Sequence, residues 1–119
     1  MIKEAYVSFE TAKLLKEKGF DIPCGHYYED NQVIIRSLLR GIWNEEEDLL
    51  SAPTHQMVLA YLREKDIYID VFPHKIYERK KQFLYEIKDE HAFYQSEGFF
   101  KTYEEATEAA IKYSLENLI

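Results

Sequence analysis

The hydrophobic and polar positions near the start of the chain predict a short amphipathic helix over residues 9–18. Ser8 suits the N-cap, because its hydroxyl can accept a hydrogen bond from a free N–H group of the first turn. Gly19 suits the residue after the last turn, where a left-handed backbone is favourable for glycine. The apolar face between them contains Ala12, Leu14 and Leu15. A helix at this spacing buries one narrow stripe.

Two further helices follow from the same periodicity. Residues 51–54 contain Pro53 and predict the first turn of a helix that ends within residues 63–66. Its expected buried face consists of Met57, Val58, Tyr61 and Leu62. Near the end of the chain, Thr102 and Glu105 match a capping box. The helix that they begin carries a flat face of Ala106, Ala109, Ala110 and Tyr113.

Strict alternation of side chains predicts a pair of strands over residues 67–72 and 83–88. In the first of these, Ile67, Ile69 and Val71 are expected to face the core. Pro73 is expected to end that strand, so that residues 73–81 form the connecting loop. Residues 92–94 predict a third, shorter strand.

Residues 26–28 and 32–35 flank a turn-prone segment and predict a hairpin. A helix over residues 32–40 remains an alternative, because Ile34, Leu38 and Leu39 also fit one helical face. Helices and strands do not alternate strictly along the chain. We therefore expect a single α+β domain over residues 1–119, with a small antiparallel sheet covered by helices on one face.

Composition limits the classes of function. The chain has 119 residues, with 15 basic and 22 acidic side chains and a net charge of −7. This charge argues against a general nucleic-acid binder, whose surface is usually basic. Cys24 is the only cysteine and cannot form an internal disulfide, which fits a reducing cytoplasm. No stretch is apolar and long enough for a membrane helix, so we expect no membrane partner.

Motifs for chemistry are sparse. The glycines have no phosphate-loop spacing, and no nucleophile elbow is present. Cys24 and His26 are two residues apart and would share a strand face, but zinc usually takes three or four ligands. We therefore expect no catalytic residues, no cofactor and no metal, and the protein is not expected to be an enzyme.

Two charged segments are the candidate contact sites. Lys75, Tyr77, Arg79, Lys80 and Lys81 combine cations with an aromatic ring, as in some single-strand binders, although they also suit a solvated loop. The second segment contains Trp43 with Glu45, Glu46, Glu47 and Asp48. Four adjacent carboxylates predict an exposed loop or a helix start. With Trp43 beside them they suit a basic protein partner, unless the indole packs into the core.

Three stretches of the chain carry a resemblance to a known family. They are residues 7–20 (Val-Ser-Phe-Glu-Thr-Ala-Lys-Leu-Leu-Lys-Glu-Lys-Gly-Phe), residues 52–54 with 62–64, and residues 103–106. They resemble small uncharacterised phage, prophage and mobile-element proteins of Bacteroides-like bacteria. The resemblance implies an intracellular phage or prophage setting and adds no catalytic residue.

The absence of catalytic motifs and the small acidic domain favour a non-catalytic binding or accessory module. The expected location is the cytoplasm, and the expected partner is a protein. The alternative is a nucleic-acid-associated accessory protein that uses the basic stretch of residues 75–81.

Overall fold

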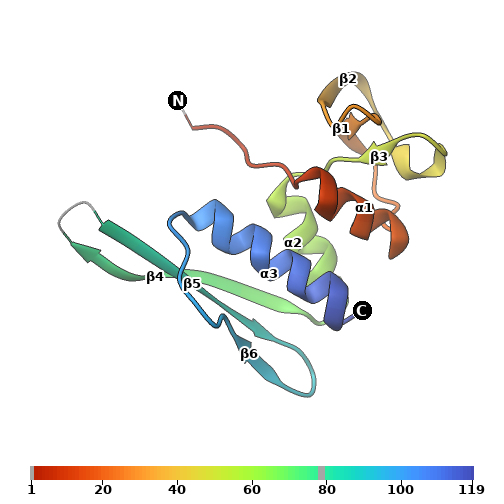
Figure 1. Ribbon diagram of the computed structural model, residues 1–119. Helices are drawn as coiled ribbons and strands as arrows, with labels where there is room; N and C mark the ends of the chain where they lie inside the picture. Colours follow the sequence, from red (N-terminus) through yellow and green to blue (C-terminus); the bar gives the residue numbers. More distant parts are fainter. Residues whose placement is uncertain (1, 78–79) are drawn as a thin grey trace. The chain divides into compact units, whose positions relative to one another are not determined.

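The computed structural model describes residues 2–77 and 80–119, with the backbone alone for residues 75–77. The chain divides into two compact units, which we call the N-terminal unit (residues 1–55 with Ile119) and the C-terminal unit (residues 56–118). Within the described residues, each unit carries one antiparallel three-stranded sheet (Figure 1). The α+β class with antiparallel strands is therefore confirmed. One domain over residues 1–119 stays a prediction.

The first helix of the N-terminal unit, α1 (Phe9–Glu17), has both of its predicted ends. The hydroxyl of Ser8 accepts a hydrogen bond from the N–H of Thr11 at 3.2 Å. At the other end Gly19 has a φ of 83°, a left-handed conformation that favours glycine. The N–H groups of Gly19 and the following residue bond to carbonyls of the last turn at 3.1 and 2.9 Å, which completes a Schellman motif.

The sheet of the N-terminal unit has the strand order β2-β1-β3. Strands β1 (Cys24–Tyr28) and β2 (Ile34–Gly41) form the predicted hairpin, so the helical alternative for residues 32–40 is wrong. Strand β3 (Leu50–Ser51) pairs with the opposite side of β1. The hydroxyl of Tyr28 donates to the carbonyl of Val7 at 2.6 Å and ties β1 to the segment before α1.

The segment predicted as the first turn of the second helix is extended instead. Ser51 belongs to β3, and the helix α2 (His55–Glu64) begins only after residues 52–54. The reason is backbone pairing on both sides. The N–H of Ala52 donates to the carbonyl of His26 at 3.0 Å, and the carbonyl of Pro53 accepts from the N–H of Val7 at 3.1 Å. These tertiary bonds outweigh the local preference of Pro53 for a helix start.

The sheet of the C-terminal unit has the order β4-β5-β6, formed by β4 (Tyr68–Tyr77), β5 (Lys80–Lys88) and β6 (Phe93–Gln95). Helix α3 (Tyr103–Asn117) lies along one face of the β4–β5 hairpin (Figure 1). Its N-cap is the predicted Thr102, whose hydroxyl accepts from the N–H of Glu105 at 3.0 Å. Ala106 and Ala110 are fully buried, as the flat face predicted.

The predicted end of β4 at Pro73 is wrong, and so is the predicted loop for residues 73–77 and 80–81, whereas residues 78 and 79 lie outside the described residues. Strand β4 continues to Tyr77 through a register shift after Pro73, and β5 begins at Lys80. Proline is tolerated here because β4 is an edge strand and its partner Phe83 bonds elsewhere. The N–H and carbonyl of Phe83 both bond to Phe100, each at 2.9 Å, so the ladder needs no N–H from Pro73.

The prediction of which side chains face the core is confirmed for some residues and only partly for others. Leu62 of α2 is fully buried, and Ile67, just before β4, is buried as well. Ile69 and Val71 are half-buried. Further buried side chains of the C-terminal unit are Ile87, Ile111 and Leu115.

Candidate functional site

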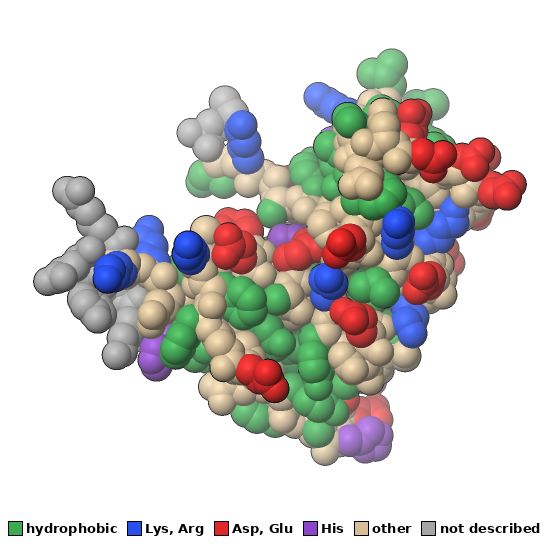
Figure 2. Space-filling view, in the orientation of Figure 1, with side chains coloured by type: hydrophobic (Ala, Val, Ile, Leu, Met, Phe, Trp, Pro, Cys, Tyr) green, Lys and Arg blue, Asp and Glu red, His purple; other side chains and the backbone are tan. Residues whose placement is uncertain are grey.

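The C-terminal unit contains a pocket of about 700 Å³ near the tip of the β4–β5 hairpin, which we call the basic pocket. Its lining residues are Lys80, Lys81, Gln82, Phe99, Phe100 and Lys101. Two short segments supply them, namely the start of β5 and the segment that precedes α3. Figure 2 shows Lys or Arg side chains and a His side chain at this end of the hairpin.

Backbone hydrogen bonds fix the two segments side by side. Phe83 and Phe100 form an isolated antiparallel bridge with two reciprocal bonds of 2.9 Å. In this register Lys101 lies beside Gln82, and Phe99 lies beside Leu84. Because side chains alternate between the faces of an extended chain, Phe99 and Lys101 share one face, while Phe100 points to the other.

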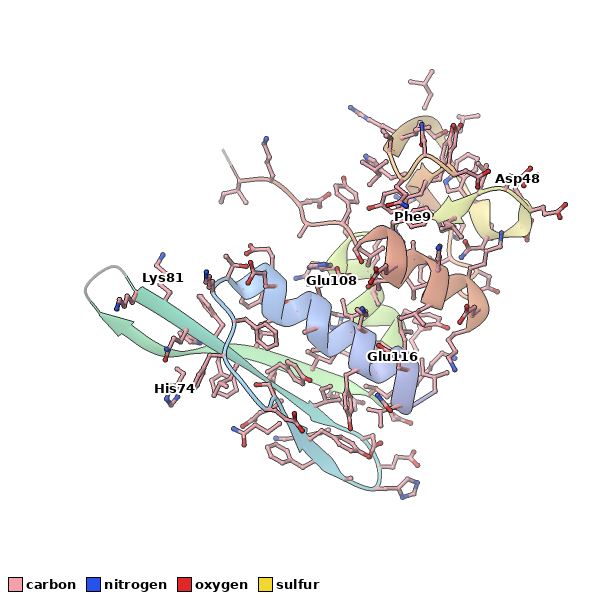
Figure 3. All side chains as sticks on the ribbon, in the orientation of Figure 1. Phe9, Asp48, His74, Lys81, Glu108 and Glu116 are labelled. Carbon is pink, nitrogen blue, oxygen red and sulfur yellow. The ribbon has the colours of Figure 1, made fainter. Side chains whose placement is uncertain are left out.

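The aromatic residues of the basic pocket differ in burial. Phe99 is 52% exposed, and its ring is stacked on that of His74, with centroids 4.9 Å apart and planes inclined by 25°. Figure 3 shows His74 and Lys81 extending from the hairpin. Phe100 is half-buried and its ring lies 6.0 Å from that of Tyr85. Half of the surface of Phe99 is therefore open to a ligand, whereas Phe100 packs against β5.

The charge of the basic pocket is not neutralised by the described part of the protein. Among the described residues, no carboxylate forms an ion pair with Lys80, Lys81 or Lys101. Three ammonium groups around one hollow raise the local concentration of anions, even on a chain with a net charge of −7. The arrangement suits a ligand that combines negative charge with flat rings.

The structure places the predicted nucleic-acid residues as follows. Lys80 and Lys81 are exposed on β5 and line the basic pocket. The backbone of Lys75 pairs with Gln82, and that of Tyr77 pairs with Lys80. Their side chains lie outside the description of the structure, and Arg79 lies outside the described residues.

Sequence reasoning missed Phe99, Phe100 and Lys101. They have no helical or alternating period, and they directly precede a capping box, which is a signal for the helix that follows. The available signal was their composition, two rings followed by a cation. The bridge between Phe100 and Phe83 brings this segment to the lysines of β5.

The acidic segment lies in the N-terminal unit, and its tryptophan is held inward. A 3₁₀ helix spans Trp43–Glu45. The indole N–H of Trp43 donates to the carbonyl of Cys24 at 2.8 Å, and its ring lies 4.8 Å from that of Tyr27. A Cβ at Gly41 would come within 2.9 Å of the indole. Trp43 thus packs against the hairpin of its own unit.

The loop that follows, which we call the acidic loop (residues 45–49), is held by one lysine. The ammonium of Lys16 on α1 donates to the carbonyls of Glu46, Glu47 and Leu49 at 2.7, 3.1 and 2.9 Å. The side chains of residues 45–48 are all exposed. Figure 3 shows Asp48 projecting away from the ribbon. The loop therefore keeps its backbone in place while it presents its carboxylates to solvent.

The residues considered for metal binding have other contacts. Cys24 is buried, and its thiol donates to the carbonyl of His26 at 3.4 Å. The ring of His26 lies 4.3 Å from that of Tyr6. In the described part of the chain, no group of three or more His, Cys, Asp or Glu side chains is placed to hold a metal ion.

Comparisons with known proteins add no relative. Searches against protein-family models, curated proteins and solved structures gave no significant match. A separate finding concerns the helices of the described residues, none of which has the length and apolar character needed to cross a membrane.

Proposed function

We propose that this protein is a non-catalytic binding module and that the basic pocket binds single-stranded nucleic acid. The observation that carries the proposal is that Lys80, Lys81 and Lys101 line the same pocket as the half-exposed ring of Phe99. Proteins that bind single strands combine cations that follow the backbone with aromatic rings on which bases stack. The sequence favours a protein partner, but the lysine and rings added by residues 99–101 bring nucleic acid to first place.

The setting of this proposal is a reducing cytoplasm, as the single free Cys24 suggests. An origin in a phage, a prophage or a mobile element also belongs to the proposal, and it rests on the sequence resemblance alone.

Titration of a fluorescently labelled oligothymidine with the intact protein tests the binding of nucleic acid. Three phosphate contacts on a single strand predict a slope of about −2 for log affinity against log salt, since each contact contributes about −0.7. Replacing Lys80, Lys81 and Lys101 by Ser should abolish binding. Lys88→Ser removes one positive charge at the other end of β5 and is the control for the loss of a lysine outside the pocket, so it should leave binding unchanged.

The stacking part of the proposal is tested by Phe99→Ala. Removal of a stacking ring costs about 1–3 kcal/mol per base, which corresponds to a loss of affinity of about five- to 150-fold. The salt slope should stay the same, because no cation is removed. Equal affinities of the wild type, the triple lysine variant and Phe99→Ala would contradict the proposal.

A second candidate function is the binding of a basic protein surface by Glu45, Glu46, Glu47 and Asp48. The observation that favours it is the triple carbonyl contact of Lys16, because a pre-ordered loop loses less entropy on binding. Affinity capture from nuclease-treated host lysate tests this function, with the wild type compared with a variant that carries Gln and Asn at these four positions. A partner lost only from the variant supports it. Identical captures contradict it.

A further inference from the structure

A second pocket of the C-terminal unit has a different chemistry. It has a volume of about 410 Å³, and we call it the tyrosine pocket. Its lining residues include Tyr85, Tyr94, Phe100 and Tyr113, together with residues 95–98. Four of the residues that line this pocket are therefore aromatic, and the face of an aromatic ring carries partial negative charge.

Three elements hold these rings in two pairs. Tyr85 of β5 lies against Phe100, with centroids 6.0 Å apart and planes inclined by 28°. Tyr94 of β6 lies against Tyr113 of α3 at 5.6 Å, with planes inclined by 50°. Because the two pairs come from different elements, the shape of the pocket depends on the fold rather than on one mobile segment.

Two hydrogen bonds between Ser96 and Tyr85 hold the segment of residues 95–98 that lines the tyrosine pocket. The N–H of Ser96 donates to the carbonyl of Tyr85 at 3.0 Å. The hydroxyl of Ser96 in turn accepts from the N–H of Tyr85 at 3.3 Å. Residues 95–98 are therefore tied to β5, and Glu97 is held at the rim of the pocket.

Among the described lining residues, Glu97 is the one that carries a carboxylate. Burial raises the pKa of Tyr85, and the charge of Tyr113 and then that of Glu97 raise it further, so both groups act on the Tyr85 hydroxyl. In the described part of the chain, no Lys or Arg forms an ion pair with Glu97. The carboxylate of Glu97 thus lines the same pocket as four aromatic residues and has no ion pair with a described Lys or Arg. A pocket of this kind suits a positively charged ligand.

The geometry points to a binding site for a methylated ammonium group in the tyrosine pocket. A methylated ammonium spreads its charge over methyl groups and is weakly hydrated, so it enters an aromatic cage at low desolvation cost. A primary ammonium is strongly hydrated, so its transfer from water into the same pocket costs more free energy of desolvation. This ligand class differs from that of the basic pocket, and Phe100 is the only lining residue that the two pockets share among those described.

The test uses the intact protein, with the aromatic side-chain signals followed by NMR. Choline is the first probe, and its neutral isostere, in which carbon replaces nitrogen, is the second. We expect choline to shift the signals of Tyr94 and Tyr113 with saturation in the millimolar range, and the isostere to bind at least tenfold more weakly. Equal affinity for the two compounds would show a merely apolar hollow and overturn the inference.

Substitutions at the rim locate the site. Tyr94→Leu and Glu97→Gln lie at half-buried and exposed positions, so both variants should fold, which thermal unfolding checks. Each should weaken choline binding at least fivefold. Tyr68→Leu and Glu90→Gln make the same changes at exposed positions outside the pocket and should leave it unchanged. Unchanged binding in Tyr94→Leu and Glu97→Gln would overturn the inference.

The last arm distinguishes a free small molecule from a modified side chain. A short peptide with trimethylated lysine is compared with the same peptide carrying unmodified lysine. Tighter binding of the trimethylated peptide than of choline assigns the site to protein recognition, and the reverse order assigns it to small quaternary amines. Oligothymidine binding by Glu97→Gln should match that of the wild type. A negative result for choline binding in the tyrosine pocket can therefore be distinguished from a negative result for nucleic-acid binding in the basic pocket.

Discussion

The acidic loop and the basic pocket are both charged surfaces, but different interactions hold them. In the N-terminal unit, side chains hold the backbone of the loop, through Lys16 and through the indole of Trp43. In the C-terminal unit, the backbone holds the side chains, through the bridge between Phe83 and Phe100. The loop therefore depends on a few individual residues, whereas the pocket depends on the sheet.

This difference changes what an aromatic residue beside a charged run means. Trp43 stands next to the carboxylates in the sequence, yet its ring and its N–H are both used within its own unit. Phe99 lies far from Lys80 and Lys81 in the sequence, yet it lines their pocket with half of its surface exposed. The sequence suggested that Trp43 contacts a partner unless it packs inward, and the exposed ring beside the lysines comes from another segment.

The largest effect that tests this comparison is expected for Trp43→Ala. The change removes a half-buried ring and leaves the carbonyl of Cys24 without its donor. We expect a loss of about 3 kcal/mol in the free energy of unfolding, at the lower end for large aromatic residues in proteins. Denaturant unfolding followed by circular dichroism measures it. Trp43→Phe keeps a ring and should lose less, and an unchanged midpoint in Trp43→Ala would show that the indole is not an anchor.

A smaller effect is expected for Lys16→Met, which keeps the aliphatic stem and removes three hydrogen bonds to carbonyls. Since the site is partly exposed, we expect a loss of about 1 kcal/mol in stability. Cleavage of the acidic loop by a glutamate-specific protease should become faster. Lys13→Met on the same helix, where the ammonium lies over the ring of Phe9, is the control. Equal cleavage rates in the two variants would contradict the role of Lys16.

The parts of the fold that local interactions determine were predictable. Ser8 and Gly19 mark the ends of α1, and Thr102 marks the start of α3, because caps and left-handed glycines act within one turn. The alternation of residues 83–88 likewise predicted β5. These signals need no knowledge of the rest of the chain.

The wrong boundaries and the missed site residues depend on distant pairing. Pro53 follows its pairing with Val7 rather than its preference for a helix start, and Pro73 is tolerated because Phe83 bonds to Phe100. The basic pocket forms through that same bridge, which joins segments separated by the whole of β6. The sequence predicted two of its lysines, but pattern reasoning does not pair segments at that separation.

The counterpart of the tryptophan variant is Phe99→Ala. Its ring is half-exposed and stacks on His74, and such a pair contributes about 0.5–1.5 kcal/mol. We expect a loss of stability of about 1 kcal/mol or less, far below that of Trp43→Ala, together with the loss of oligothymidine affinity described above. Thermal unfolding and binding are measured on the same sample. A loss of stability equal to that of Trp43→Ala would show that the ring of Phe99 stabilises the fold as much as that of Trp43 does. The two aromatic residues would then not differ in role.

The smallest effect is a loss of stability expected only above pH 10. It tests the packing of Tyr85 against Phe100, which lines both pockets. Burial, the charge of Tyr113 and that of Glu97 raise the pKa of Tyr85 above its ordinary value of 10.0. As the pH rises past this value, the unfolded chain releases the Tyr85 proton before the folded protein does, so unfolding becomes more favourable. The contribution to stability is fully present below pH 10 and is lost as the pH rises through the folded-state pKa. Tyr85→Phe has no proton to release at this position.

The comparison between wild type and Tyr85→Phe isolates this residue, since the other tyrosines are present in both proteins. The wild type should lose stability more steeply above pH 10 than Tyr85→Phe, as measured by urea unfolding at a series of pH values. A titration of tyrosinate absorbance should show one late-ionising group fewer in the variant. Phe100 of the basic pocket lies against Tyr85. A steeper loss of stability with pH in the wild type would therefore indicate that Tyr85 is buried in the sheet where it contacts this pocket residue. Parallel slopes would show that the Tyr85 hydroxyl is as well solvated in the folded protein as in the unfolded chain, which would contradict its burial against Phe100.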